Sequence, residues 1–261
     1  MTSYQFEEET KKDPSWASRL TKTVKVTDFC DMKGSNITHL SPFLHFAGRN
    51  LDGCSADFSK CPLLWAAEGT FAGFVDFRGS GLTRIGKLKV NQPNSDGEAA
   101  NFSCCRALAE ASGHFNGSVD FAETGIQKIR DLTILQSDKD GLAADFDGCQ
   151  KLAIAEGSFP GFVNFDHCSI ESIGKLTLTG TPWKTVLDSE ETTEAGVVDS
   201  IRRKDTFASF LHCRNLKTFP LERFDANPVL LSPETRAAGK KERRKKQKTL
   251  LALQAGNTLT I

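Results

Sequence analysis

The chain repeats itself every 44 residues, and this period constrains its fold more than any other feature. Three stretches align along their whole length, beginning at Ala56, Ala100 and Ala144, and the phenylalanines and cysteines within them keep the same spacing. A fixed period in this range is typical of solenoids, in which each unit contacts only its neighbours. The sequence therefore predicts an elongated scaffold with an extended binding surface.

Each period divides into a unit of about 19 residues with the pattern A-x-F-x-x-C-x-x-L and one of about 25 with the pattern V-D-F-x-x-S/T-G-I/L-x-x-I. Both are variants of the leucine-rich-repeat signature. Alternate residues of a strand point the same way, so Ala56 and Phe58 are expected to be buried. We expect a leucine-rich-repeat solenoid with one short strand per repeat in a parallel sheet on the concave face, a mostly irregular convex side and short terminal helices.

The repeat extends beyond the three clear copies, because residues 30–42 match the second unit type and residues 208–220 match the first. We expect about eight units over residues 30–227, with residues 1–29 as an N-terminal cap and residues 228–261 as a basic, helical C-terminal tail. End units of a solenoid need special sequences because one face has no neighbour.

An insertion at residues 180–207 interrupts the array. Val197, Val198 and Ile201, followed by Arg202-Arg203-Lys204, fit a short amphipathic helix. Long surface loops are tolerated at little cost, but insertions in repeats also often lie on the binding face.

Four of the eight cysteines, Cys61, Cys105, Cys149 and Cys213, share one column of the repeat. Column members two coils apart lie about 10 Å from each other, beyond the roughly 7 Å that a disulfide spans. We expect these thiols to be free and buried, and Cys54 and Cys104 to be the most accessible.

No stretch is long and apolar enough for a transmembrane helix, and the N-terminal residues lack the apolar core of a secretory signal. We expect a protein that is cytoplasmic, or secreted without a recognisable signal peptide.

A column of acidic, amide and hydroxyl residues is the first candidate binding feature. We call it the Asp/Asn column; its members are Asp31, Asp57, Asp76, Asn101, Asp120, Asp145, Asn164 and Ser209. Neighbouring strands lie about 4.8 Å apart, so adjacent aspartates repel one another. Either the column serves a cationic partner, or its side chains bond to nearby backbone and to Lys60 and Arg78.

With their neighbours, these residues give the predicted concave, protein-binding face: Asp31, Asp57, Lys60, Asp76, Arg78, Asn101, Asp120, Glu123, Asp145, Asp147, Asn164 and Asp166.

The motif [N/D]-x-D-G occurs three times, at residues 50–53, 94–97 and 138–141. Asp-Gly is a typical tight-turn composition, although paired oxygens beside a glycine also suit calcium. We favour turns, and expect neither a metal nor a cofactor.

The second candidate is the basic tail, which carries Lys240, Lys241, Arg243, Arg244, Lys245, Lys246 and Lys248. Ser232-Pro233 resembles a helix start, and the cations suit nucleic acid, an anionic membrane surface or a nuclear import receptor. A solvated helix, or a helix folded over the acidic column, is equally consistent with this sequence.

The sequence lacks a phosphate-binding loop, a G-x-S-x-G motif and an H-E-x-x-H motif. The neighbours His167-Cys168 and His212-Cys213 do not indicate a nucleophile, because adjacent strand residues point to opposite faces. We therefore expect no catalytic residues, with an enzyme using Cys54 or Cys104 as a third alternative.

The phrase A-x-F-x-x-C-x-x-L-x-x-F-P at residues 208–220, with the Ile-Gly pairs at residues 85–86 and 173–174, resembles the BspA-like leucine-rich repeats of bacterial surface antigens. The resemblance covers about residues 30–224. It implies a scaffold that recognises a host protein, and related repeats occur in bacterial effectors, so it also implies a virulence-associated protein delivered into a host cell.

Overall fold

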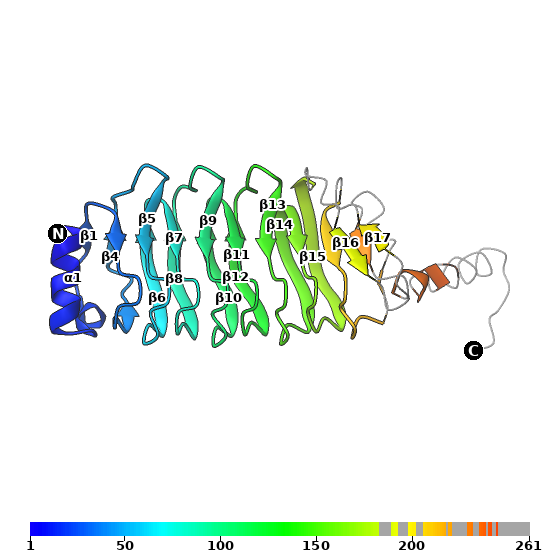
Figure 1. Cartoon of the computed structure of the whole chain (residues 1–261), viewed down its shortest axis with the longest axis horizontal. Helices are drawn as coiled ribbons and strands as arrows, with labels where there is room; N and C mark the ends of the chain where they lie inside the picture. The colour runs from blue at the N-terminus through cyan, green and yellow to red at the C-terminus, as the bar shows by residue number, and fades with distance from the viewer. Residues whose placement is uncertain are drawn as a thin grey trace, which may run out of the picture.

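The computed structural model is a rod of stacked coils in which two parallel sheets run along the long axis (Figure 1). The structure describes residues 1–182, 189–192, 198–201, 206–217, 219–220, 229–231, 235–238, 240–241 and 244. A repeating, mostly parallel β architecture agrees with the solenoid predicted from the period.

The first sheet contains the short strands that the repeat pattern predicts, together with β19, which lies beyond residue 227 in the segment predicted to be a helical tail. In spatial order they are β2 (Cys30–Asp31), β5 (Cys54–Asp57), β7 (Phe74–Asp76), β9 (Glu98–Asn101), β11 (Ser118–Asp120), β13 (Leu142–Asp145), β14 (Ile154–Asn164), β18 (Ala208–Phe210) and β19 (Val229–Leu231). Strand β15 (Ser172–Thr181) also pairs with β14.

A second parallel sheet occupies the side that the repeat pattern predicts to be mostly irregular, so that prediction was wrong. Its strands are β1 (Val24–Val26), β4 (Leu44–Phe46), β6 (Ala66–Phe71), β8 (Arg84–Val90), β10 (Glu110–Phe115) and β12 (Lys128–Ile134), with β3 (His39–Leu40) beside β6. In β8, Ile85, Leu88 and Val90 are buried, whereas Lys87 and Lys89 are exposed. A bulge shifts the register of these strands, which obscures their alternation in the sequence.

Stacked phenylalanines fill the core between the sheets. One ring from each coil of the first sheet stacks on the next, in the order Phe58, Phe77, Phe102, Phe121, Phe146, Phe165 and Phe210. The centroid of Phe121 lies 5.2 Å from those of both Phe102 and Phe146. Because the rings are buried and touch on both faces, each coil stabilises its two neighbours.

The cysteine column lies in the same interior, as predicted. Cys61, Cys105, Cys149 and Cys213 are buried, and each thiol donates to a backbone carbonyl of a preceding coil. In the coils that alternate with these, a hydroxyl side chain takes the place of the cysteine. The hydroxyl of Ser80, for example, lies 3.4 Å from the sulfur of Cys105. Cys168 takes such a position and is also buried, donating to the carbonyl of Phe146 at 3.0 Å.

A helix covers the N-terminal end of the rod. Helix α1 (Ser3–Lys12) begins with a capping box at Thr2, and the 3-10 helix η1 (Trp16–Arg19) follows it. The ring of Phe6 lies 5.5 Å from that of Phe46 and 5.4 Å from that of Trp16. Strand β1 lies within residues 1–29, the segment predicted to be the cap, and it pairs with β4. The second sheet therefore begins before residue 30.

The predicted helix in the insertion is wrong for its described part. Strand β16 (Ser189–Thr192) pairs antiparallel with β17 (Val198–Ile201), as β-branched Val198 and Ile201 favour an extended backbone. Val197 and the segment Arg202-Arg203-Lys204 lie outside the described residues. In the tail, residues 235–238 are helical, as are Lys240, Lys241 and Arg244. None of the described helices is long and apolar enough to cross a membrane.

We expect alkylation to distinguish the cysteines. Cys104 is exposed and Cys54 is partly exposed, while the other six are buried. Partial burial and nearby Glu123 raise the pKa of the Cys104 thiol, so it should react more slowly than a free cysteine. Peptide mass spectrometry after iodoacetamide treatment should show Cys104 modified first and Cys54 later. Modification of Cys61 or Cys105 at the rate of Cys104 in the folded protein would contradict the buried column.

Candidate binding surface

The Asp/Asn column is continuous in the structure. The residue pairing of the first sheet places Asp31 beside Asp57, Asp57 beside Asp76 and Asp76 beside Asn101. The same register continues through Asp120, Asp145, Asn164 and Ser209. The 44-residue period therefore places these side chains along one edge of the rod.

Each acidic or amide side chain of the column caps the turn after its strand. An oxygen of Asp57 accepts a hydrogen bond from the backbone N–H of Ser59 at 2.8 Å. The same bond, from the backbone N–H two residues further along the chain, is made at 2.8 to 2.9 Å by Asp76, Asn101, Asp120 and Asp145. This is the bonding of an Asx turn. Local backbone bonding thus explains why Asp or Asn recurs here, and the cap uses one side-chain oxygen.

Not every member of the predicted face is accessible. Asp76, Asn164 and Asp166 of this face are buried, as is Ser209 of the Asp/Asn column, so these four side chains do not present a surface to a partner. Asp31 is exposed, and Asp57, Asp120 and Asp145 are partly exposed. Among neighbouring residues, Lys60, Arg78 and Glu123 are exposed, whereas Asn101 and Asp147 are partly exposed.

Carboxyl groups crowd together where Asp120 and Asp145 lie side by side. Burial raises the pKa of Asp120, and it raises the pKa of Asp145 to about 7, with Asp120, Asp147 and Asp166 adding repulsion. Arg78 pairs with Asp76 at 2.8 Å. Within the described coils, no ion pair neutralises Asp57, Asp120 or Asp145.

Replacing Asp145 by asparagine should change the pH dependence of stability. The pKa of Asp145 in the folded state is about 7, above its ordinary value of 3.8, so the folded protein holds this proton more tightly than the unfolded chain. The contribution of Asp145 to the free energy of unfolding is therefore greatest below about pH 4, and it is lost as the pH rises to about 7. The variant should be more stable than the wild type at pH 8, by on the order of 2 kcal/mol, and not at pH 4.

Urea unfolding at both pH values measures this difference. Asparagine already holds the cap at positions 101 and 164, so the substitution preserves the turn. Asp31→Asn is the matched control, because Asp31 is exposed in the same column. An equal change in stability for both variants would contradict a special environment at Asp145.

The three [N/D]-x-D-G motifs form turns. Asn50 accepts from the backbone N–H of Cys54 at 2.8 Å, while Asn94 and Asp138 bond in the same way to Glu98 and Leu142 at 2.9 Å. The first side chain of each motif is thus used by the backbone. No group of three potential metal-ligating His, Cys, Asp or Glu side chains occurs within the described residues.

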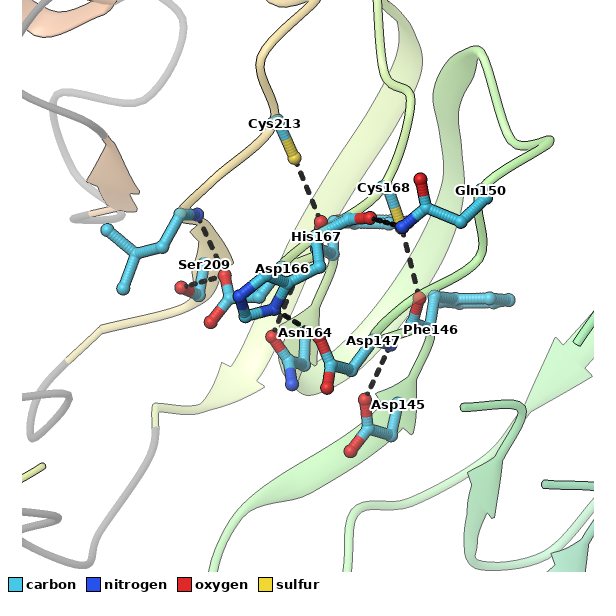
Figure 2. A network of polar contacts seen from close by, with 12 residues as sticks. Asp145, Phe146, Asp147, Gln150, Asn164, Asp166, His167, Cys168, Ser209 and Cys213 are labelled. Carbon is cyan, nitrogen blue, oxygen red and sulfur yellow. Dashed lines mark hydrogen bonds and ion pairs between the residues drawn. The ribbon is translucent and has the colours of Figure 1, made fainter. Parts of the chain in front are cut away.

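The column ends in a polar network around His167 (Figure 2). The Nδ1 atom of His167 lies 2.9 Å from Oδ1 of Asp147, and its ring stacks on that of His212 with centroids 4.6 Å apart. Asp166 accepts from the hydroxyl of Ser209 and, at 2.8 Å, from the N–H of Leu211. The sequence analysis missed this pair of histidines, although both follow the Asp/Asn column by three positions.

Sequence reasoning also missed the cations on the outer side of the second sheet. Arg84, Lys87 and Lys89 on β8, and Lys128 and Arg130 on β12, are exposed. Of the basic tail, Lys240, Lys241 and Arg244 are described and exposed, whereas Arg243, Lys245, Lys246 and Lys248 lie outside the described residues.

Comparison with known proteins adds no relative: no family model, no curated protein and no solved structure matches this chain.

Proposed function

We propose that this chain is a non-catalytic leucine-rich-repeat scaffold that binds a basic protein segment along the exposed part of the Asp/Asn column. The observation that carries the proposal is the regular row of carboxylates in which Asp57 and Asp120 form no ion pair with a described residue, although Arg78 lies near enough to interact with both electrostatically. Asp57 and Asp120 lie in one register, with a buried aspartate and an asparagine between them. One oxygen of each caps a turn, and the side chain of Ser103 also bonds to Asp120.

The electrostatics favour a cationic partner. A carboxyl group whose pKa is raised by burial and by neighbouring carboxylates is stabilised in its charged form when a cation approaches. Asp120 and Asp145 are both in this state. A lysine or arginine of a partner would therefore interact more strongly here than with an isolated surface aspartate.

The proposal includes a role as a bacterial effector or virulence-associated protein that recognises a host protein. It rests on the resemblance of residues 208–220 to BspA-like repeats. A host protein would bind the same exposed part of the Asp/Asn column. The capture experiment described next therefore tests this surface whichever protein binds there.

The test is partner capture with graded charge variants. The immobilised chain should recover a basic partner from candidate host lysate. Asp57→Asn with Asp120→Asn should weaken recovery while preserving both turn caps, and Asp57→Lys with Asp120→Lys should abolish it. The matched control is Asp52→Lys with Glu171→Lys, which reverses two exposed charges away from the column.

The competing function is binding of nucleic acid or an anionic membrane through the basic tail. The exposure of Lys240, Lys241 and Arg244 favours it. Salt-sensitive binding to DNA, RNA or anionic vesicles that disappears on deletion of residues 232–261 would support this alternative. Partner capture that survives this deletion, but not the charge reversal at Asp57 and Asp120, supports the acidic column.

A further inference from the structure

A histidine near the N-terminal end of the rod has a ring nitrogen without a hydrogen bond. His39, on the short strand β3, is 8% exposed, and its Nδ1 atom is buried. Among the residues that the structure describes, this is the one buried side-chain nitrogen or oxygen that has no hydrogen-bond partner. Buried polar atoms are nearly always paired in folded proteins, so this exception requires a physical account.

The imidazole belongs to a stack that crosses three coils. Strand β6 pairs with β3 on one side and with β8 on the other, and Trp65 directly precedes β6. The imidazole centroid lies 5.3 Å from that of Trp65, and the guanidinium of Arg84 lies 5.1 Å from the centroid of the same Trp65 ring. Arg84 is in turn paired with Glu68 at 3.2 Å. The Trp65 ring therefore lies between a histidine and a cation.

A neutral imidazole fits this place, and an imidazolium does not. Protonation makes both ring nitrogens donors, and the buried Nδ1 atom has no acceptor. It would also place a second positive charge against Trp65, whose ring already contacts Arg84. Burial lowers the pKa of His39, an effect that Glu68 opposes and Arg84 reinforces. The protonated ring must therefore turn out of the stack toward water.

Three elements bring charged groups to the strand that carries His39. From β6 the ring faces Glu68, and from β8 it faces Arg84. The 3-10 helix η1 also packs against β3 and carries Arg19, which is paired with Asp13. The two groups that act on the imidazole are thus themselves an ion pair, and its cation lies against Trp65.

The backbone beside His39 joins the N-terminal segment to the second coil. Thr38 donates to the carbonyl of Pro14 from its N–H at 3.1 Å and from its hydroxyl at 3.2 Å. The carbonyl of Thr38 accepts from the N–H of Trp65 at 3.0 Å. Rotation of the His39 ring out of the stack would remove the packing next to this bridge.

We propose that His39 is an acid-sensitive latch: its neutral ring holds β3 and the segment around Pro14 against β6, and its protonation releases them. The rest of the rod stays folded, because the phenylalanine stack holds its coils together. The latch is independent of the proposed protein-binding function, because none of its residues belongs to the Asp/Asn column.

The direction of the pH dependence follows from linkage. The pKa of His39 is below its ordinary value of 6.5 when the ring is buried, and it returns toward this value when the ring is in water. The open form therefore binds the proton more tightly than the closed form. The latch is closed above about pH 6.5, and it weakens as the pH falls below this value.

Amide hydrogen exchange at pH 7 and pH 5, read by mass spectrometry and corrected for the intrinsic exchange rate, measures the opening. Protection of residues 38–40 and 65–67 should fall by about tenfold at pH 5, whereas protection of β10 should not change. In the same pH range, the imidazole ¹H–¹³C signal of His39, assigned by its loss in His39→Phe, should titrate below pH 6.5.

Substitutions separate the latch from other acid effects. His39→Phe keeps an aromatic ring beside Trp65 but takes up no proton, so protection should be equal at the two pH values. Arg84→Gln removes the cation and leaves Glu68 without its ion pair, which favours the imidazolium, so opening should begin at a higher pH than in the wild type. His45→Phe is the matched control, because His45 is only partly buried on β4, which also pairs with β6. It should keep the wild-type pH dependence.

Undiminished protection of residues 38–40 at pH 5 would overturn the proposal, as would titration of His39 at or above pH 6.5. A loss that persists in His39→Phe would assign the opening to another group. An equal loss in β10 would show unfolding of the whole rod instead of local release. If His39→Phe does not fold, an unchanged midpoint in Arg84→Gln decides against the latch, and a raised midpoint supports it.

Discussion

Replacement of Phe121 by alanine is expected to lower the free energy of unfolding by about 3–5 kcal/mol. The ring is fully buried and stacks on Phe102 and Phe146 at 5.2 Å, with an angle of 8° between planes on both sides. Its removal leaves a cavity in the middle of the stack, and both neighbours lose a contact face. Guanidinium unfolding followed by circular dichroism measures the loss.

Phe43→Ala is the control, because Phe43 is 40% exposed and lies outside the stack. It should cost less than about 1 kcal/mol. The loss for Phe210→Ala should be smaller than for Phe121→Ala, because Phe210 stacks face to face on Phe165 and meets Phe219 edge-on. A loss below about 1 kcal/mol for Phe121→Ala would contradict a close-packed interior.

The second large effect is expected for Gly125→Ala, which should destabilise the protein by about 2–4 kcal/mol. A Cβ atom at this position would lie 2.3 Å from the backbone oxygen of Arg106 and 3.2 Å from that of Leu108. Both atoms belong to the preceding coil, so relief of the clash requires the two coils to separate. Urea unfolding gives the change directly.

Gly79→Ala separates this steric effect from the conformational one. Gly79 has a φ of +65°, but a Cβ atom there would meet nothing within 4 Å. Only the left-handed backbone disfavours alanine, at about 1 kcal/mol. Equal costs for the two variants would show that the coils can move apart easily, contrary to the close approach at Gly125.

The 44-residue period predicted the first sheet well, because inward-pointing phenylalanines must fall in register for the coils to stack. Phe58, Phe102 and Phe146 are buried as expected. The second sheet was missed because its strands carry a bulge, which breaks the alternation by which strands are recognised. The hairpin in the insertion was missed because Val198 and Ile201 fit a helical face and a strand equally well when no neighbours are known.

The sequence placed the Asp/Asn column in the correct register, but could not predict the accessibility of each member. Asp76 and Asn164 have the same local turn as Asp57, yet both are buried. The paired histidines were overlooked because each was compared with the cysteine next to it in the chain. Alignment of His167 with His212 across the repeat, three residues after Asn164 and Ser209 respectively, would have identified the pair.

Helix α1 has a consequence for how these rods behave in concentrated solution. Exposed strand edges at the end of a parallel stack are templates onto which another chain can add. Phe6 packs against the rings of Phe46 and Phe58, where a further coil would otherwise place its own aromatic residue. Helix α1 therefore disfavours the addition of a second chain at this end. Phe6, which completes the core, also occupies the place where such a chain would pack.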